Sequence, residues 1–298
     1  MRLHGGLLPR RCVELASLGE AHGFDSLWFA ENPLERGTLA TLGACALATT
    51  RIELGIGVWN PYLRAPAQIA MDASALDELS QGRLALGLGS GLAAPIQKLG
   101  IDNSRPLAAL KECFATVRAL LRGEEVNGTK LSYKTRADLP LLMAARGPQA
   151  LALAGRIADG LMVSNMCPPG FAKHAASIAR PKRLVQYAPC AVGPDRAKAQ
   201  ATMKPVLTGL LKTFWNLAQR VPAARDSLVT HSGIPESVFA SGEPDERLIE
   251  AFTVTGDADD IRRRLDAYRE AGVTDLVLTL VGPDPVHDMA YLLRAART

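Results

Sequence analysis

Residues 77–91 read DELSQGRLALGLGSG, and this stretch carries the pattern that decides the fold. A segment of helical character ends at Gly82, and a short apolar run follows from Leu84 to Leu88. Glycine just past a helix adopts the left-handed conformation without a Cβ penalty. A run that is apolar throughout is typical of a strand covered on both faces of a parallel sheet. The stretch therefore predicts a helix followed by a buried strand, as in α/β proteins.

The same junction recurs along the chain, at Gly23, Gly160 and Gly272. Further strands are expected at residues 2–6, 52–58, 139–144 and 184–192. This makes about eight strands alternating with about eight helices, which form either a closed (β/α)8 barrel or an open doubly wound sheet. The strand count and the length of 298 residues favour the (β/α)8 TIM barrel.

One region breaks the alternation, because residues 196–250 are too long for a single connection. A helix is expected over 197–219, followed by a segment rich in proline, serine and charge. Connections of this size usually serve as lids over a ligand or are disordered. We expect one domain, residues 1–298, with a helical and loop insertion at about 196–250 before the last strand. The next helix, 257–271, begins at Asp257, with Asp260 placed to complete a capping box.

Composition excludes several classes of protein. The chain has 34 basic and 30 acidic residues, a net charge of +4 that does not suggest a nucleic-acid groove. No uncharged run approaches the ~18 residues of a membrane span, and the first residues lack an apolar signal core. Five cysteines without a Cys-x-x-Cys pair indicate reduced thiols and a cytoplasmic location. The five histidines show no metal-binding spacing, so no metal is expected.

Candidate site residues follow the strands, because active sites of such barrels lie at the carboxyl ends of the strands. Glu31 and Asn32 follow the second strand, where a carboxylate serves as acid, base or ligand acceptor, or merely as a capping or ion-paired residue. After the third strand, the run 55–66 offers two aromatics, an amide and two prolines around Asn60. Its alternative reading is an ordinary loop from a strand to a helix.

Two glycine-containing turns are further candidates. The run 87–91 ends a strand, but Leu92 stands where a dinucleotide fingerprint needs glycine, and Pro95 argues against a helix start there. This run is therefore either a plain tight turn or a bare backbone against which a flat ring packs. The run 144–150 joins a strand to a helix, and Arg146 at the helix start predicts a phosphate site. Its alternative is an ordinary turn with a solvated arginine.

Together these residues resemble the luciferase-like superfamily of flavin and deazaflavin oxidoreductases. The resemblance rests on runs found in order along the chain: 23–31, 50–55, 77–84, 86–91, 144–148, 153–160 and 271–275. Within the superfamily, the runs 57–64 and 146–148 resemble the methylenetetrahydromethanopterin reductase branch. The resemblance implies a (β/α)8 barrel, a homodimer, and the deazaflavin coenzyme F420 as cofactor, with FMN as the alternative.

The resemblance also implies roles for individual residues. A non-prolyl cis peptide of the family, behind the flavin ring, maps to Gly57-Val58. Glu31 and Asn32 would lie beside the ring as catalytic residues. Related deazaflavin enzymes have Asp-His here, and an amide cannot protonate a substrate as histidine can. The other cofactor-binding residues are expected to be Asn60, Ser90 and Gly91 along the ring, and Arg146, Gly147, Gln149 and Ala150 at the phosphate.

The sequence thus predicts an oxidoreductase that transfers a hydride between reduced F420 and a small organic substrate, the insertion covering that substrate. An FMN-dependent luciferase-like monooxygenase is the alternative. Leu92 and Pro95 stand where a sugar-phosphate dehydrogenase of the family has Glu and Asn, so glucose 6-phosphate is not expected as substrate. Two hypotheses of other classes remain: a flavin-binding protein without turnover, and a barrel that binds a phosphorylated metabolite.

Overall fold

The computed structural model describes residues 1–297, in which strands and helices alternate as expected. The chain forms two compact units, each described by itself. The N-terminal unit comprises residues 2–145 and 153–162. The C-terminal unit comprises Met1, residues 146–152 and the chain from Val163 onward. The α6 helix (Pro148–Ile157) has residues in both.

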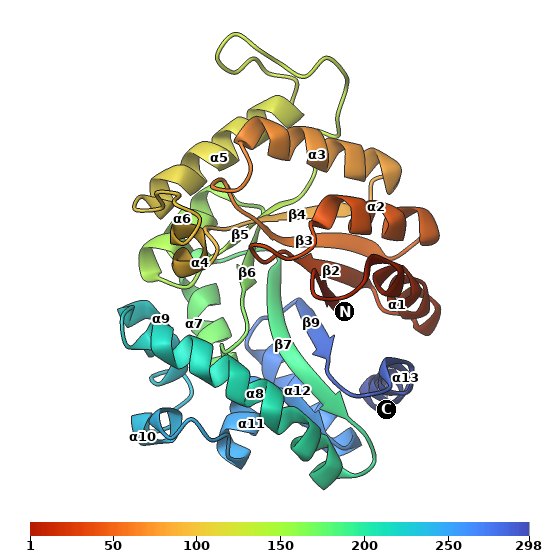
Figure 1. Ribbon diagram of the computed structural model, residues 1–298, viewed down its shortest axis with the longest axis vertical. Coiled ribbons are helices and arrows are strands. Elements are labelled where there is room, and N and C mark those ends of the chain that lie inside the picture. The colour runs from red at the N-terminus through yellow and green to blue at the C-terminus, as the bar shows by residue number, and fades with distance from the viewer. Residues whose placement is uncertain (298) are drawn as a thin grey trace. The chain divides into compact units, whose positions relative to one another are not determined.

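The N-terminal unit is built on parallel strands in which each pairs with the next along the chain (Figure 1). They are β1 (Arg2–His4), β2 (Ser26–Ala30), β3 (Glu53–Trp59), β4 (Leu84–Leu88), β5 (Leu141–Ala144) and β6 (Gly160–Val163). Residues of β4 and β6 are buried throughout, which explains why these strands read as unbroken apolar runs. The parallel order places the carboxyl ends of neighbouring strands on one edge.

The helices of the N-terminal unit cover the segments between its strands. They are α1 (Pro9–His22), α2 (Thr38–Ala48), α3 (Pro66–Leu79), α4 (Ala93–Gln97) and α5 (Pro106–Leu121). Three of them, α1, α3 and α5, start with proline, whose fixed φ suits the first helical turn. Gly23 ends α1 with φ 95°, and its N–H donates to Gly19 and Glu20. The expectation that no helix starts near Pro95 is wrong, since α4 contains it.

The C-terminal unit contains β7 (Leu184–Val192), which pairs in parallel with both β8 (Val254–Gly256) and β9 (Asp275–Leu280). Its other helices are α7 (Pro169–Ala179), α12 (Ala258–Glu270) and α13 (Pro285–Arg297). The expected capping box is present, because the Asp257 side chain accepts from the Asp260 N–H while Asp260 accepts from the Asp257 N–H. The β8 strand was not predicted. The expectation that the insertion precedes the last strand is therefore wrong, because residues 196–250 lead into β8 and the last strand is β9.

The insertion is helical almost throughout. The helix expected over 197–219 is α8 (Arg196–Ala218), and the segment rich in proline and serine folds into α9 (Pro222–Leu228), α10 (Glu236–Ala240) and α11 (Glu246–Phe252). These helices lie against α8, which also contacts β7 (Figure 1). Met203, Leu207, Leu211 and Phe214 of α8 form one apolar core with Phe239 and Phe252. Within residues 1–297, no helix has the length and hydropathy to cross a membrane.

Strand packing generates the first prediction. Gly55 pairs with Trp28 on the neighbouring strand, and a Cβ at Gly55 would collide with the fully buried indole. We expect Gly55→Ala to lower the free energy of unfolding by about 1–3 kcal/mol, the usual effect of overpacking, and to lower the Tm. Gly209→Ala is the control, because open space surrounds Gly209 in α8 and alanine favours the helix. A Tm of Gly55→Ala at or above that of the unaltered protein would contradict this packing.

Candidate active site

The predicted residues of the N-terminal unit lie at the carboxyl ends of three neighbouring strands. Glu31 and Asn32 follow β2, Asn60 follows β3, and the Ser90-Gly91 turn follows β4. This is the edge at which parallel α/β proteins bind their ligands. Parallel pairing of β2 with β3 and of β3 with β4 therefore brings the three runs, which are distant in sequence, to one side of the unit.

The Gly57-Val58 peptide is cis, as the resemblance implied. Beside it, the pairing of β3 with β4 shifts by one residue between Gly57 and Trp59. A Cβ placed at Gly89 would lie 3.0 Å from both a Val58 methyl carbon and the Ala144 Cβ. At Gly87 a Cβ would collide with the carbonyl oxygen of Ile56. The two strand ends thus approach so closely that β4 has room only for glycine here.

Asn60 is buried and shapes the loop that follows β3. Its Oδ1 accepts hydrogen bonds from the backbone N–H groups of Tyr62, at 3.1 Å, and Leu63, at 2.9 Å. This is the Asx arrangement that fixes a turn. The Asn60 Nδ2 lies 3.7 Å from the position a Cβ would take at Gly91, so Asn60 and the β4 turn are neighbours. The structure therefore brings together Val58, Asn60 and the run 89–91.

Two polar groups in the same loop have unused hydrogen-bonding capacity. The Trp59 Nε1 and the Tyr62 hydroxyl are buried and, among residues 1–297, have no hydrogen-bond partner. Leaving a buried donor unpaired costs about 1–3 kcal/mol, so such groups call for an explanation such as a bound ligand. These two groups make the start of this loop a candidate place for a ligand with polar atoms.

Glu31 is held as an ion by its neighbours. Its carboxylate forms an ion pair with the Arg64 guanidinium and accepts from the Thr38 hydroxyl and from the Thr38 N–H, the latter at 3.0 Å. Burial alone raises the pKa of Glu31, but the hydrogen bonds from Arg64 and Thr38 outweigh it and leave the pKa below its usual value. The carboxylate also caps the start of α2. Glu31 is therefore held as a carboxylate by its partners, and its catalytic role stays a prediction.

Asn32 follows Glu31 in the sequence, and Arg64 is the ion-pair partner of Glu31. Asn32 is exposed, and its Nδ2 donates to a Glu35 carboxylate oxygen at 3.1 Å. The Arg64 guanidinium carbon lies 4.7 Å from the centre of a Trp59 ring. The ion pair thus connects the end of β2 to the loop after β3. No polar contact of Asn32 with the other predicted site residues is present in the described chain, and its catalytic role stays a prediction.

The predicted phosphate turn lies in the C-terminal unit. Arg146 donates to the Ser227 hydroxyl at 2.8 Å and to the Asn165 carbonyl oxygen at 3.0 Å, and its guanidinium lies 5.1 Å from the centre of the Phe214 ring. The first turn of α6 leaves backbone N–H groups without partners inside the helix. Gln149 is exposed, while Gly147 and Ala150 are partly buried. Arg146 is thus fixed by the insertion rather than solvated, and the phosphate role of this turn stays a prediction.

Asn165 and Ser227 are functional candidates that the sequence interpretation missed. Asn165 follows β6 as Asn60 follows β3, so the same strand-end signal was present in the sequence. Its side-chain Oδ1 is buried and has no hydrogen-bond partner in residues 1–297. Ser227 is fully buried and gave no such signal, because its place beside Arg146 depends on how the insertion folds.

Parallel strands that alternate with helices along the chain define an α/β protein of the TIM-barrel class. Residues 2–275 match the luciferase-like monooxygenase family. The protein belongs to this family.

Individual relatives are similar over almost the whole chain. A 5,10-methylenetetrahydromethanopterin reductase of Methanolobus tindarius is 31% identical over 301 residues, covering 92% of this chain and 91% of the relative. The solved structure of the F420-dependent tetrahydromethanopterin reductase from Methanopyrus kandleri has a TM-score of 0.80 at 23% identity, covering 98% of this chain and 96% of that one. The fold is therefore the TIM-barrel-like fold of that reductase, as the sequence predicted.

Two further solved structures share the fold but differ in chemistry. An F420-dependent secondary alcohol dehydrogenase, solved with an F420–acetone adduct, has a TM-score of 0.76 at 20% identity and covers 100% of this chain and 98% of its own. A type II Baeyer–Villiger monooxygenase component of Pseudomonas putida, solved with FMN, has a TM-score of 0.73 at 16% identity, with coverages of 97% and 90%. At these identities the likeness concerns the fold.

The Glu31 ion pair generates a prediction about pH. We expect Glu31→Gln to lower the free energy of unfolding at pH 7 by about 1–3 kcal/mol, because it removes charged hydrogen bonds to Arg64 and Thr38. The pKa of Glu31 is lowered in the folded protein, so its contribution is complete above the unfolded value of about 4.5 and is lost as the pH falls through the folded value. The Tm difference between the two proteins should therefore shrink on acidification.

Glu14→Gln is the matched control, because Glu14 forms an exposed ion pair with Arg11, and such pairs contribute little. Its Tm should follow that of the unaltered protein at every pH. A Glu31→Gln difference that stays constant from pH 7 to pH 3 would show that Glu31 is not stabilising as an ion.

Proposed function

We propose that this protein is an oxidoreductase that transfers a hydride between the deazaflavin coenzyme F420 and a small organic substrate. The observation that carries the proposal is the similarity to the Methanolobus tindarius reductase, which extends over 91% of that enzyme. The unpaired polar groups of Trp59 and Tyr62 also support the proposal, because a bound cofactor with polar atoms would satisfy them.

When bound, the coenzyme supplies the redox chemistry, and the protein supplies binding, orientation and charge. Gly57, Val58, Asn60, Ser90 and Gly91 are proposed to line it. The turn of Arg146, Gly147, Gln149 and Ala150 is proposed to hold its phosphate, since Arg146 has further N–H groups beyond those given to Ser227 and Asn165. Each set keeps the role that the sequence predicted for it.

Glu31 and Asn32 are poorly suited to donate a proton to a substrate. Glu31 is ionised and paired with Arg64, and an amide has no titratable proton to give. These residues therefore position the reactants, and a substrate that must be protonated takes its proton from another group. Asn32, in place of a histidine, also keeps open the hypothesis of a flavin-binding protein without turnover.

FMN is the second candidate cofactor. The Baeyer–Villiger component that shares the fold was solved with FMN, and a monooxygenase would follow from that choice. The protein is expected to act on a small molecule rather than on nucleic acid, and location in the cytoplasm remains a prediction from the sequence.

A homodimer is a further part of the proposal, supported by the surface of α2. This helix has no charged residue, yet Leu39 and Leu47 are 38% and 73% exposed on it. Met71 of α3, which packs against α2, is also exposed. An exposed apolar surface of this kind is typical of an interface between copies.

The cofactor test is a titration of purified protein with F420 and with FMN, read by fluorescence. We expect F420 to bind more tightly than FMN, and Arg146→Ala to weaken F420 binding by about 1–3 kcal/mol because a charged hydrogen-bond donor is lost. Arg269→Ala is the control, since Arg269 is an exposed arginine on α12 of the same unit. Tight binding of FMN but not of F420 would show that FMN is the cofactor. An Arg146→Ala variant that binds F420 as tightly as the unaltered protein would show that Arg146 is not part of the site.

The dimer test uses α2. Leu47→Glu places a charge on the exposed apolar face, so we expect the mass measured by light scattering to fall from two chains to one. Val221→Glu is the control, because Val221 is also exposed but lies in the insertion. A Leu47→Glu variant that keeps the mass of the unaltered protein would exclude α2 from the interface.

A further inference from the structure

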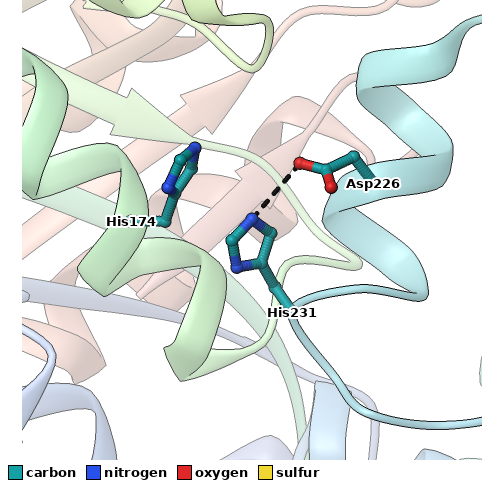
Figure 2. Close-up of side chains that lie close together, drawn as sticks. All are labelled: His174, Asp226 and His231. Carbon is teal, nitrogen blue, oxygen red and sulfur yellow. Dashed lines mark ion pairs between the residues drawn. The ribbon is translucent and has the colours of Figure 1, made fainter.

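We propose that His174, Asp226 and His231 form a binding site for a divalent transition-metal ion. Figure 2 shows the three side chains together, His174 on α7, Asp226 on α9, and His231 in the segment between α9 and α10. All three belong to the C-terminal unit. They are separate from every residue assigned above to the cofactor, so the proposal does not depend on the proposed function.

The donor atoms are already close. One ligand atom from each side chain lies within 4.8 Å of the others, and the Asp226 Oδ2 lies 3.2 Å from the His231 Nε2. In a tetrahedral site with bonds of ~2.0–2.2 Å, ligand atoms lie roughly 3.3–3.6 Å apart. The two histidine rings lie beside each other, with centres 4.4 Å apart and planes tilted by 31°. Small side-chain rotations are therefore enough to bring the three donors to one ion.

The backbone holds the histidines in this position. A Cβ at Gly170 would collide with the His231 carbonyl oxygen, so the first turn of α7 and the backbone at His231 are in direct contact. His174 lies four residues after Gly170 on the same helix, and residues four apart share one face. The His231 N–H donates to the Asp226 carbonyl oxygen at 3.3 Å, which closes the turn after α9. The site is thus assembled by main-chain packing before any metal binds.

The donor set indicates which ions bind. Two imidazole nitrogens and one carboxylate oxygen suit zinc, cobalt and nickel, whereas magnesium and calcium prefer oxygen ligands alone. The Asp226 side chain is 47% exposed and that of His231 is 18% exposed, so solvent reaches the cluster. Water is therefore available as the fourth ligand. Phe171 packs edge-on against His231, with ring centres 5.5 Å apart.

A metal here would join the insertion to α7, because Asp226 and His231 belong to the insertion and His174 does not. Asp226 is followed directly by Ser227, whose hydroxyl accepts from Arg146. The ion would therefore fix the turn that orients Arg146. His174 and Asp226 are far apart in sequence, so a metal that binds both closes a long loop. Closing a long loop restricts the unfolded chain more than closing a short one.

Binding is tested with tag-free protein that has been treated with chelator and dialysed. We expect calorimetric titration with zinc chloride at pH 7.5 to give one strong site per chain, and zinc to raise the Tm. Cobalt should give the visible absorption of a tetrahedral complex. All five cysteines are buried, so thiols are poor competitors.

Variants locate the site. His174→Gln, His231→Gln and the conservative Asp226→Asn should each weaken zinc binding at least tenfold and abolish the Tm increase. His287→Gln is the matched control, since His287 is an exposed histidine on α13 and should leave both unchanged. Circular dichroism without metal establishes that each variant is folded. Zinc binding that is absent in the unaltered protein, or equal in all four variants, would overturn the proposal.

Limited trypsin digestion tests the connection between the insertion and α7. Arg225 is exposed and adjacent to Asp226, so zinc should slow cleavage after Arg225 in the unaltered protein and in His287→Gln. It should have no effect in His174→Gln, whose cleavage site is intact. Equal zinc protection in His174→Gln would show that the ion does not bridge α7 and α9, and would overturn the site as assigned.

Discussion

The close approach of β3 and β4 at their carboxyl ends is the constraint on which the N-terminal part of the site depends. At Gly87 the Ile56 carbonyl oxygen and the Met162 sulfur leave no space for a side chain, and Val58 packs where one would stand at Gly89. These glycines are buried, and neighbouring side chains fill the space beside them. The same packing places Trp59 and Asn60 beside the β4 turn, so one steric requirement fixes both the core and the start of the loop after β3.

The charged and polar groups at this edge pair with one another. Glu31, Arg64 and Thr38 satisfy one another, and the resulting ion pair connects β2, the start of α2 and the loop after β3. Protonation of the Glu31 carboxylate is unfavourable, because Arg64 and Thr38 form hydrogen bonds to its charged form. The residue that appeared in the sequence as a candidate acid or base is thus the group that holds the corner together.

The insertion performs a comparable task in the C-terminal unit. Its helices share one apolar core around Phe214 and Phe239, so they form a folded element and not a flexible connection. From this element Ser227 orients Arg146, while Asp226 and His231 reach the face of α7 that carries His174. A single short helix, α9, therefore connects the predicted phosphate turn to the cluster for which we propose a metal.

The sequence alone determined the alternation of strands and helices, the α8 helix, and the capping box of Asp257 and Asp260, and its resemblance to a family implied the position of the cis peptide. Apolar runs, helix caps and family motifs are local and are written in consecutive residues. Only the tertiary structure decided that Glu31 pairs with Arg64, that Ser227 meets Arg146, and that His174 joins His231. These partners are tens of residues apart, and their meeting depends on how whole helices pack, which no local spacing of side chains records.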